Sequence, residues 1–123
     1  NRNMIMISIA ASLAIKNQID HLWYAAHSGD HEIYPDCRPE FIDKMAAVLE
    51  ICDYHKIKFE APFQNFSKSE IVKTGLAMGL DYSKAWTCYE GKDFPCKKCS
   101  ACLERAYSFE INNTKDPLNV LQD

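Results

Sequence analysis

Four cysteines near the C-terminus constrain the fold of this 123-residue chain more than any other feature. Cys88, Cys96, Cys99 and Cys102 follow the spacing C-x7-C-x2-C-x2-C. Four thiolates in so short a stretch can surround one tetrahedral metal ion. The two overlapping C-x2-C steps bring the sulfurs together without a long loop closure. The spacing therefore predicts a metal-binding loop within residues 86–105.

Zinc is the metal that this ligand set favours, because soft sulfur donors in a tetrahedral array suit an ion that needs no redox chemistry. An iron–sulfur cluster is the main alternative, although the cysteine-to-proline signature of cluster-binding runs is missing. A pair of disulfides is a further alternative, which would need an oxidising compartment. Nothing at the N-terminus resembles a secretion signal. The six cysteines therefore indicate a reducing cytoplasm and a bound metal.

The composition argues against two classes of partner. Hydrophobic residues make up 47% of the chain and charged residues 25%, as in an ordinary globular domain. The formal net charge of -3 gives no basic surface for direct nucleic-acid binding. The longest apolar run begins at Met4, is broken by Lys16, and is too short to span a bilayer.

The hydrophobic pattern predicts alternating helices and strands. The predicted elements are helices over Met4–Ile15, Glu40–Tyr54, Ser67–Gly79 and Ser100–Asn112, and strands over His21–Ala26 and Lys56–Glu60. This alternation favours a parallel sheet covered by helices, and two strands make a poor sheet on their own. The predicted fold class is α/β: the second part of an open parallel-sheet, Rossmann-like domain that ends in a helical zinc-binding loop.

Several packing details follow from the same pattern. The first helix is apolar on all sides and is expected to lie under a larger structure. The first strand is expected to be buried, and Trp86 is expected to form a lid over the metal loop. The apolar face of the second helix, expected in the core, comprises Phe41, Met45, Val48, Leu49 and Cys52.

A polar loop, Ser28–Pro39, follows the first strand. In open parallel sheets, ligands bind beyond the carboxyl ends of the strands. Asp36 or Asp30 could accept hydrogen bonds from the amidine-like edge of a guanine, and Arg38 could hold a carboxylate through two parallel hydrogen bonds. A proline-stiffened surface loop with solvated charges explains the composition equally well.

Two helix N-termini are candidate anion sites. Lys68 lies at the first position of the third helix, and Arg2 and Asn3 precede the first helix. Free N–H groups and the helix dipole could hold a phosphate at either place. The alternative at Lys68 is an ordinary capping box, in which Ser67 and Glu70 satisfy the helix end.

Together these segments resemble the C-terminal half of the 7-cyano-7-deazaguanine synthase family, queuosine-pathway enzymes of the adenine nucleotide α-hydrolase group. The resemblance covers nearly the whole chain, and the motifs occur in the family's order. They are Asn1-Arg-Asn3, Tyr34-Pro-Asp-Cys-Arg-Pro-Glu-Phe41, Ala61-Pro62, Ser67-Lys-Ser-Glu-Ile-Val72, Trp86-Thr-Cys-Tyr89, the cysteine run, Arg105 and Asp116-Pro117. The combination of Tyr-Pro-Asp-Cys-Arg with the four-cysteine loop is the most specific part.

The resemblance implies an ATP-dependent ligase that converts 7-carboxy-7-deazaguanine and ammonia into 7-cyano-7-deazaguanine. It also implies magnesium with the nucleotide, a structural zinc and a homodimer. The zinc ligands would be Cys88, Cys96, Cys99 and Cys102. The candidates for catalysis are Lys68 and Arg2, and the candidates for nucleotide binding are Arg2, Asn3 and Lys68. The candidates for substrate binding are Asp30, Tyr34, Asp36 and Arg38.

One motif of the family is missing. The Ser-Gly-Gly-x-Asp-Ser loop that cradles the nucleotide phosphates does not occur, and it would lie upstream of Asn1. We therefore expect residues 1–123 to be the C-terminal part of a single synthase domain, inactive without its nucleotide-binding half. Two other hypotheses stay open: a related adenylating enzyme that acts on another carboxylate, and a non-catalytic binding module stapled by zinc.

Overall fold

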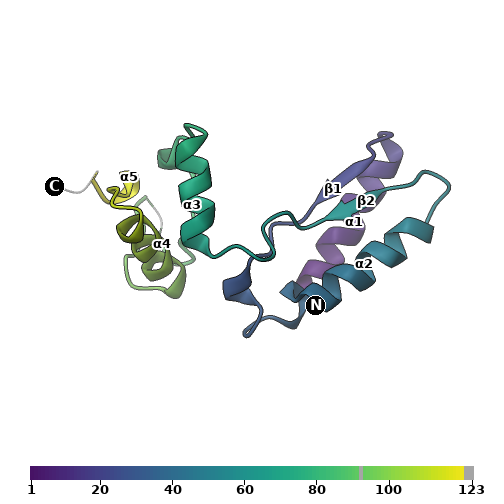
Figure 1. Ribbon diagram of the computed structural model, residues 1–123, viewed down its shortest axis with the longest axis horizontal. Coiled ribbons are helices and arrows are strands. Elements are labelled where there is room, and N and C mark those ends of the chain that lie inside the picture. Colours follow the sequence, from purple (N-terminus) through teal and green to yellow (C-terminus); the bar gives the residue numbers. More distant parts are fainter. Residues whose placement is uncertain (92, 121–123) are drawn as a thin grey trace. The chain divides into compact units, whose positions relative to one another are not determined.

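Helices and strands alternate along the chain in the predicted order (Figure 1). The structure, a computed structural model, describes residues 1–91 and 93–120. The helices are α1 (Arg2–Lys16), α2 (Pro39–Ile51), α3 (Lys68–Ala77), α4 (Ser100–Ile111) and α5 (Pro117–Val120), and the strands are β1 (His21–Trp23) and β2 (Lys58–Glu60). Short 3-10 helices, η1 (Ser28–Asp30), η2 (Pro35–Cys37) and η3 (Tyr82–Lys84), lie in the connections. The chain divides into two compact units, Asn1–Asn65 and Phe66–Asp123.

The first unit contains the predicted parallel sheet. Its two strands pair in the register Leu22 with Phe59, so the segment that contains α2 is a crossover connection. Successive side chains of a strand point to opposite faces. Phe59 therefore faces the helices and is buried, whereas Trp23 points away from them and is 71% exposed.

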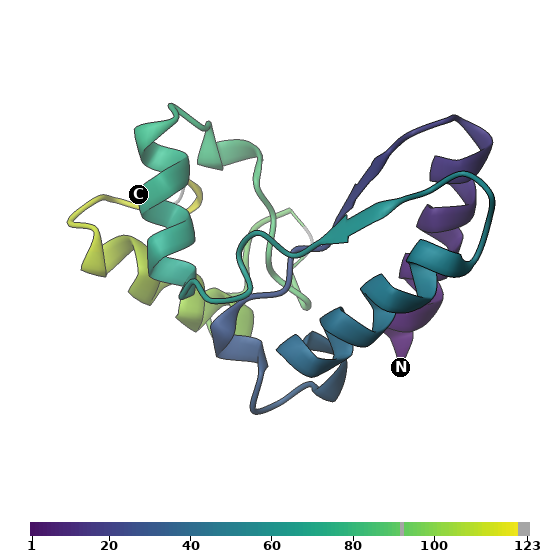
Figure 2. The same cartoon turned by 45° about the vertical axis from the view of Figure 1, so that its right-hand side comes forward.

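Both helices of this unit cover the same face of the sheet (Figure 2). Their apolar side chains form one core with the strands and the residues that follow them. The buried members from α1 are Ile7, Ala11 and Ala14, those from α2 are Ile42, Met45 and Leu49, and those around β2 are Ile57, Phe59 and Ala61. The α/β class predicted from the sequence is confirmed.

The structure shortens the predicted strand β1, and within this chain α1 and β1 are each covered on one face only. In the described part of the chain, α1 packs through one face only, and Ile5, Ile9 and Leu13 on its other side are 55%, 58% and 57% exposed. The strand predicted to be buried over 21–26 is only three residues long, and its outward face is open. Apolar composition shows that a segment can be buried, but not which of its faces a neighbour covers.

The end of α2 is a second correction. The helix stops at Ile51 rather than Tyr54, and Cys52 follows it as an exposed residue whose Sγ contacts the Leu49 carbonyl at 3.3 Å. Val48 is 54% exposed as well. Met45 and Leu49 lie in the core as expected and Phe41 packs against it, whereas Ile42 is buried in place of Val48 and Cys52.

In the second unit, the predicted capping box at the start of α3 is confirmed. The Ser67 hydroxyl accepts a hydrogen bond from the Glu70 amide at 3.3 Å, and the Glu70 carboxylate accepts one from the Ser67 amide at 2.7 Å. The helix ends just before Gly79, as expected. Ser67 and Glu70 thus supply hydrogen-bond partners for each other's backbone amides at the start of α3, and no distant residue is needed.

The packing of α3 against α4 depends on a glycine in the middle of α3. The Tyr82 ring lies over Gly75 and meets the Phe109 ring edge-on, with 5.2 Å between the ring centres. A Cβ atom at Gly75 would lie 2.2 Å from the Tyr82 hydroxyl oxygen and 2.9 Å from the ring carbon that bears it. The close approach of the tyrosine therefore requires glycine at this position.

Gly75→Ala is expected to lower the free energy of unfolding by about 1–2 kcal/mol, because overpacking outweighs the helix propensity gained from alanine. In a Tyr82→Leu background the clash is gone, so the same substitution is expected to stabilise the protein. Urea unfolding of the two single variants and the double variant measures this change of sign. A stabilising effect of Gly75→Ala in the presence of Tyr82 would contradict the packing described above.

No helix in the described ranges 1–91 and 93–120 has both the length and the apolar content needed to cross a membrane.

Candidate functional site

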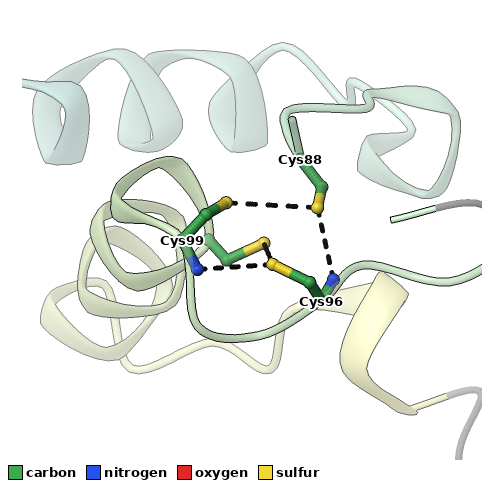
Figure 3. A group of neighbouring side chains, drawn as sticks. Cys88, Cys96 and Cys99 are labelled. Carbon is green, nitrogen blue, oxygen red and sulfur yellow. Dashed lines mark hydrogen bonds between the residues drawn. The ribbon is translucent and has the colours of Figure 1, made fainter. Parts of the chain in front are cut away.

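The four predicted metal ligands converge in the second unit. Cys88 and Cys96 lie in the loop between η3 and α4, Cys99 is the N-cap of α4, and Cys102 lies in its first turn. Their Sγ atoms all lie within 4.8 Å of one another. Figure 3 shows the sulfurs of the three labelled cysteines turned toward a common centre.

The spacing of the sulfurs fits a single tetrahedral ion. The Cys96–Cys102 and Cys88–Cys99 sulfur pairs are each 4.0 Å apart. A zinc–sulfur bond of about 2.3 Å places the corners of a tetrahedron about 3.8 Å apart. A cluster of several irons would spread its thiolates farther, because each iron lies between the cluster centre and its own cysteine. All six cysteines lie in the part of the chain that the structure describes, and none of them is paired in a disulfide there.

Backbone amides point at the sulfurs and favour the thiolate form. The Cys88 sulfur accepts hydrogen bonds from the Cys96 and Gly91 amides at 3.2 and 3.0 Å, and the Cys96 sulfur accepts one from the Cys99 amide at 3.3 Å. The bonds to the Cys88 sulfur, the one from the Cys96 amide first, lower the pKa of Cys88 to about 6. Burial instead raises the pKa of Cys102 to about 12. A bound cation would offset the burial of that fourth thiolate.

Two further contacts fix the backbone of the loop around the cluster. A Cβ atom at Gly91 would lie 2.2 Å from the Phe94 carbonyl oxygen and 3.1 Å from the Cys88 sulfur, so only glycine fits there. The Trp86 indole N–H donates a hydrogen bond to the Cys88 carbonyl at 2.9 Å. Trp86 thus supports the loop backbone, although its side chain remains 46% exposed.

A buried ion pair stabilises the second unit and was not predicted from the sequence. The Arg105 guanidinium donates to both carboxylate oxygens of Asp116, at 2.7 and 2.8 Å, and the two residues are 5% and 6% exposed. It also donates to the carbonyls of Ala85 and Tyr82, and it lies 5.3 Å from the centre of the Phe109 ring. Arg105 therefore links α4 to the segment that leads into the metal loop.

The predicted substrate loop and the start of α1 meet in the first unit. The Asp36 carboxylate accepts a hydrogen bond from the Asn3 amide at 3.3 Å, which places its negative charge at the N-terminus of α1. Arg2, the first residue of that helix, is exposed, and so is Tyr34. The structure thus brings Asn3 and Asp36 together, although 33 residues separate them in the sequence.

Asp30 and Arg38 have partners within the loop itself. Asp30 lies 3.2 Å from Nε2 of His27, a buried residue whose Nδ1 accepts a hydrogen bond from the Gly29 amide at 3.2 Å. The bond from Gly29 makes Nε2 the protonated nitrogen, so the imidazole donates to Asp30. Arg38 uses its Nε to donate to the His31 carbonyl at 2.7 Å, and its side chain is exposed. His27 was not among the predicted site residues.

Lys68 lies in the second unit, at the first position of α3, as predicted. Its ammonium group contacts the Glu104 carboxylate of α4. The lysine side chain is 26% exposed and the glutamate 41% exposed, so the pair lies at the edge of the helix interface. A phosphate at this helix N-terminus would share the lysine with Glu104 or displace it.

Comparison with known proteins gives a consistent result. Residues 1–113 match the family model of queuosine biosynthesis protein QueC. The chain is 52% identical over 118 residues to the 7-cyano-7-deazaguanine synthase of Psychromonas ingrahamii, 51% identical to that of Pseudoalteromonas translucida, and 47% identical to that of Methanoregula boonei. Each match covers 96% of this chain and 53–54% of the relative. The chain therefore spans about half the length of the curated relatives it matches.

Proposed function

The chain belongs to the family of queuosine biosynthesis protein QueC, and on this premise we propose that it is the C-terminal part of a 7-cyano-7-deazaguanine synthase. The complete enzyme would convert 7-carboxy-7-deazaguanine and ammonia into 7-cyano-7-deazaguanine at the expense of ATP. Two findings support this proposal: residues 1–113 match the family model, and relatives that carry this name are 51% and 52% identical to the chain. The proposal treats residues 1–123 as one part of a single synthase domain.

The chemistry explains why such an enzyme needs ATP. A carboxylate is a poor electrophile until one of its oxygens becomes part of a leaving group. Adenylation supplies that leaving group, and ammonia then displaces AMP to form an amide. A second activation, at the amide oxygen, allows elimination to the nitrile. Both activations develop charge on phosphates, which cationic side chains and magnesium would stabilise.

We assign a structural role to the metal. Zinc held by Cys88, Cys96, Cys99 and Cys102 would have no open coordination position, so it would bind no substrate. Its contribution would be to hold the loop and the start of α4 in one conformation. The four converging sulfurs and the amides that point at them support this assignment.

The remaining candidate residues are assigned by the chemistry of their groups. Asp36 and Asp30 would accept hydrogen bonds from the deazaguanine, Arg38 would bind its carboxylate, and Tyr34 would line the same loop. Arg2 and Asn3, in the first unit, would face nucleotide phosphates, and Lys68, in the second unit, is assigned a nucleotide-binding role from its own charge and its place at a helix N-terminus. The contact between Asn3 and Asp36 supports a shared site for the substrate and the nucleotide. From the family resemblance, we further propose a cytoplasmic homodimer.

Asp36→Asn in the complete synthase is expected to weaken binding of 7-carboxy-7-deazaguanine by about 10- to 100-fold, because hydrogen bonds to a charged acceptor are lost. Glu32→Gln, at an exposed carboxylate of the same loop, is the matched control and is expected to bind normally. Calorimetric titration without ATP measures both. Because Asp36 also caps α1, the melting temperature of each variant is recorded with the affinity. Equal affinity of the Asp36 variant and the wild type would refute the assignment.

A further inference from the structure

Three segments of the first unit meet at the buried thiol of Cys37, which is 5% exposed. The side-chain amide of Asn3, at the start of α1, lies 3.6 Å from the Cys37 sulfur. The Tyr24 hydroxyl, from just after β1, lies 3.3 Å from the same sulfur. That hydroxyl also donates to the Asp36 carbonyl at 3.1 Å. Asn3 and Tyr24 thus each form a hydrogen bond with Asp36, the residue assigned to substrate binding, and Cys37 follows Asp36 in the sequence.

The polar groups of these residues form one connected series of hydrogen bonds. The Tyr24 hydroxyl donates to the Asp36 carbonyl, and in its contact with the Cys37 sulfur either atom can be the donor. The sulfur in turn accepts from the side-chain amide of Asn3. The series therefore runs from Asn3 through Cys37 and Tyr24 to Asp36.

The surroundings keep both groups protonated at neutral pH. Burial raises the pKa of Cys37, and the carboxylates of Asp30 and Asp36 act in the same direction, while the contact with Tyr24 and the charge of Arg2 oppose them without reversing the shift. Burial and the contact with Cys37 raise the pKa of Tyr24 well above its usual range. A thiol in this state is a weak nucleophile, because the thiolate is the reactive form.

We propose that Tyr24 and Cys37 are positioning residues, which hold the Asp36 backbone against the start of α1. This inference rests on the proposed function. Asp36 would contact the deazaguanine, whereas Arg2 and Asn3 would face the nucleotide phosphates. Adenylation needs the two reactants in fixed relation, and small displacements are costly. This series of hydrogen bonds connects the residue assigned to the substrate with the residues assigned to the nucleotide.

The test uses Tyr24→Phe, Cys37→Ala and Cys37→Ser in the complete synthase, with Tyr54→Phe, at a fully exposed tyrosine, as control. Tyr24→Phe keeps the stacking of the ring on Phe59, at 6.1 Å between centres, and removes only the hydroxyl. Tyr24→Phe and Cys37→Ala are each expected to raise the KM for 7-carboxy-7-deazaguanine about tenfold, with a much smaller change in kcat. Cys37→Ser, which can still donate and accept, is expected to stay within about threefold of the wild type.

The double variant distinguishes one connected series of hydrogen bonds from two independent contacts. Because the bonds act in series, Tyr24→Phe combined with Cys37→Ala is expected to raise KM little more than either change alone. Two outcomes would overturn the proposal. One is an unchanged KM in both Tyr24→Phe and Cys37→Ala; the other is a Cys37→Ser variant as impaired as Cys37→Ala, since the thiol itself would then be needed.

A second readout separates this inference from the proposed function. If the wild-type synthase does not turn over 7-carboxy-7-deazaguanine, the proposed function fails, and the chain of hydrogen bonds is judged by amide hydrogen exchange. Tyr24→Phe and Cys37→Ala are expected to speed exchange in residues 34–38 about tenfold, and Cys37→Ser to restore the slower rate. Unchanged exchange in the first two variants would overturn the positioning role independently of any activity.

Discussion

Removal of zinc is expected to lower the melting temperature sharply and to unfold the loop of residues 86–105 together with the start of α4. Structural zinc sites contribute on the order of 10 kcal/mol to folding in small zinc-dependent domains. The four sulfurs described here lie within 4.8 Å of one another, and without a cation their thiolates would repel. Differential scanning calorimetry before and after chelation, with metal content measured in parallel, checks this expectation.

The matched control for the metal site is Cys52→Ser, an exposed cysteine outside the cluster. This variant is expected to keep one zinc per chain and the wild-type melting temperature, whereas Cys99→Ser is expected to lose both. Re-addition of zinc to the chelated protein should restore the transition. An unchanged melting temperature after verified metal removal would contradict a structural role, and iron in place of zinc would contradict the identity of the metal.

Arg105→Ala is expected to lower the free energy of unfolding by about 3–5 kcal/mol, measured by urea denaturation. The reason is the environment of its partner: the Asp116 side chain is 4% exposed and would be left as a buried, uncompensated charge. The backbone carbonyls of Tyr82 and Ala85 would each lose the guanidinium donor as well, while the Tyr82 carbonyl keeps its hydrogen bond from the Ala85 amide. The unfolding transition should also become less cooperative, because Arg105 would no longer link α4 to the segment that leads into the metal loop.

Two further variants test the cause of that loss. Arg105→Met combined with Asp116→Leu removes both charges and is expected to recover most of the stability, because replacing a whole buried pair costs less than breaking it. Lys84→Ala removes one partner of an exposed pair with Asp81, whose side chains are 83% and 53% exposed, and should leave the stability almost unchanged, because solvent screens such a pair. A double variant as unstable as Arg105→Ala would show that packing, not charge, dominates.

Features that depend on local spacing could be predicted from the sequence. The cysteine cluster, the capping box at Ser67 and Glu70, and the end of α3 before Gly79 all lie within short segments, and the structure contains each of them. In these cases the partners are so close along the chain that the backbone geometry alone brings them together.

Features that depend on distant partners could not be predicted in this way. Asp36 was expected to bind substrate, and no local pattern indicated its hydrogen bond with the Asn3 amide in the first turn of α1, 33 residues earlier. Arg105 and Asp116 were recognised as motif residues without their pairing, because nothing in either segment specifies the other. The exposed faces of α1 and β1 belong to the same category, since burial depends on which elements lie opposite.

The positions of the tryptophans have a practical consequence. The chain contains two, and each compact unit holds one: Trp23 on the outward face of β1, and Trp86 bound to the backbone of Cys88. Tryptophan fluorescence of residues 1–123 therefore has one emitter in each unit. A variant that keeps only Trp86 follows the metal loop, and one that keeps only Trp23 follows the sheet, so the order in which the two units lose structure can be observed in a single optical experiment.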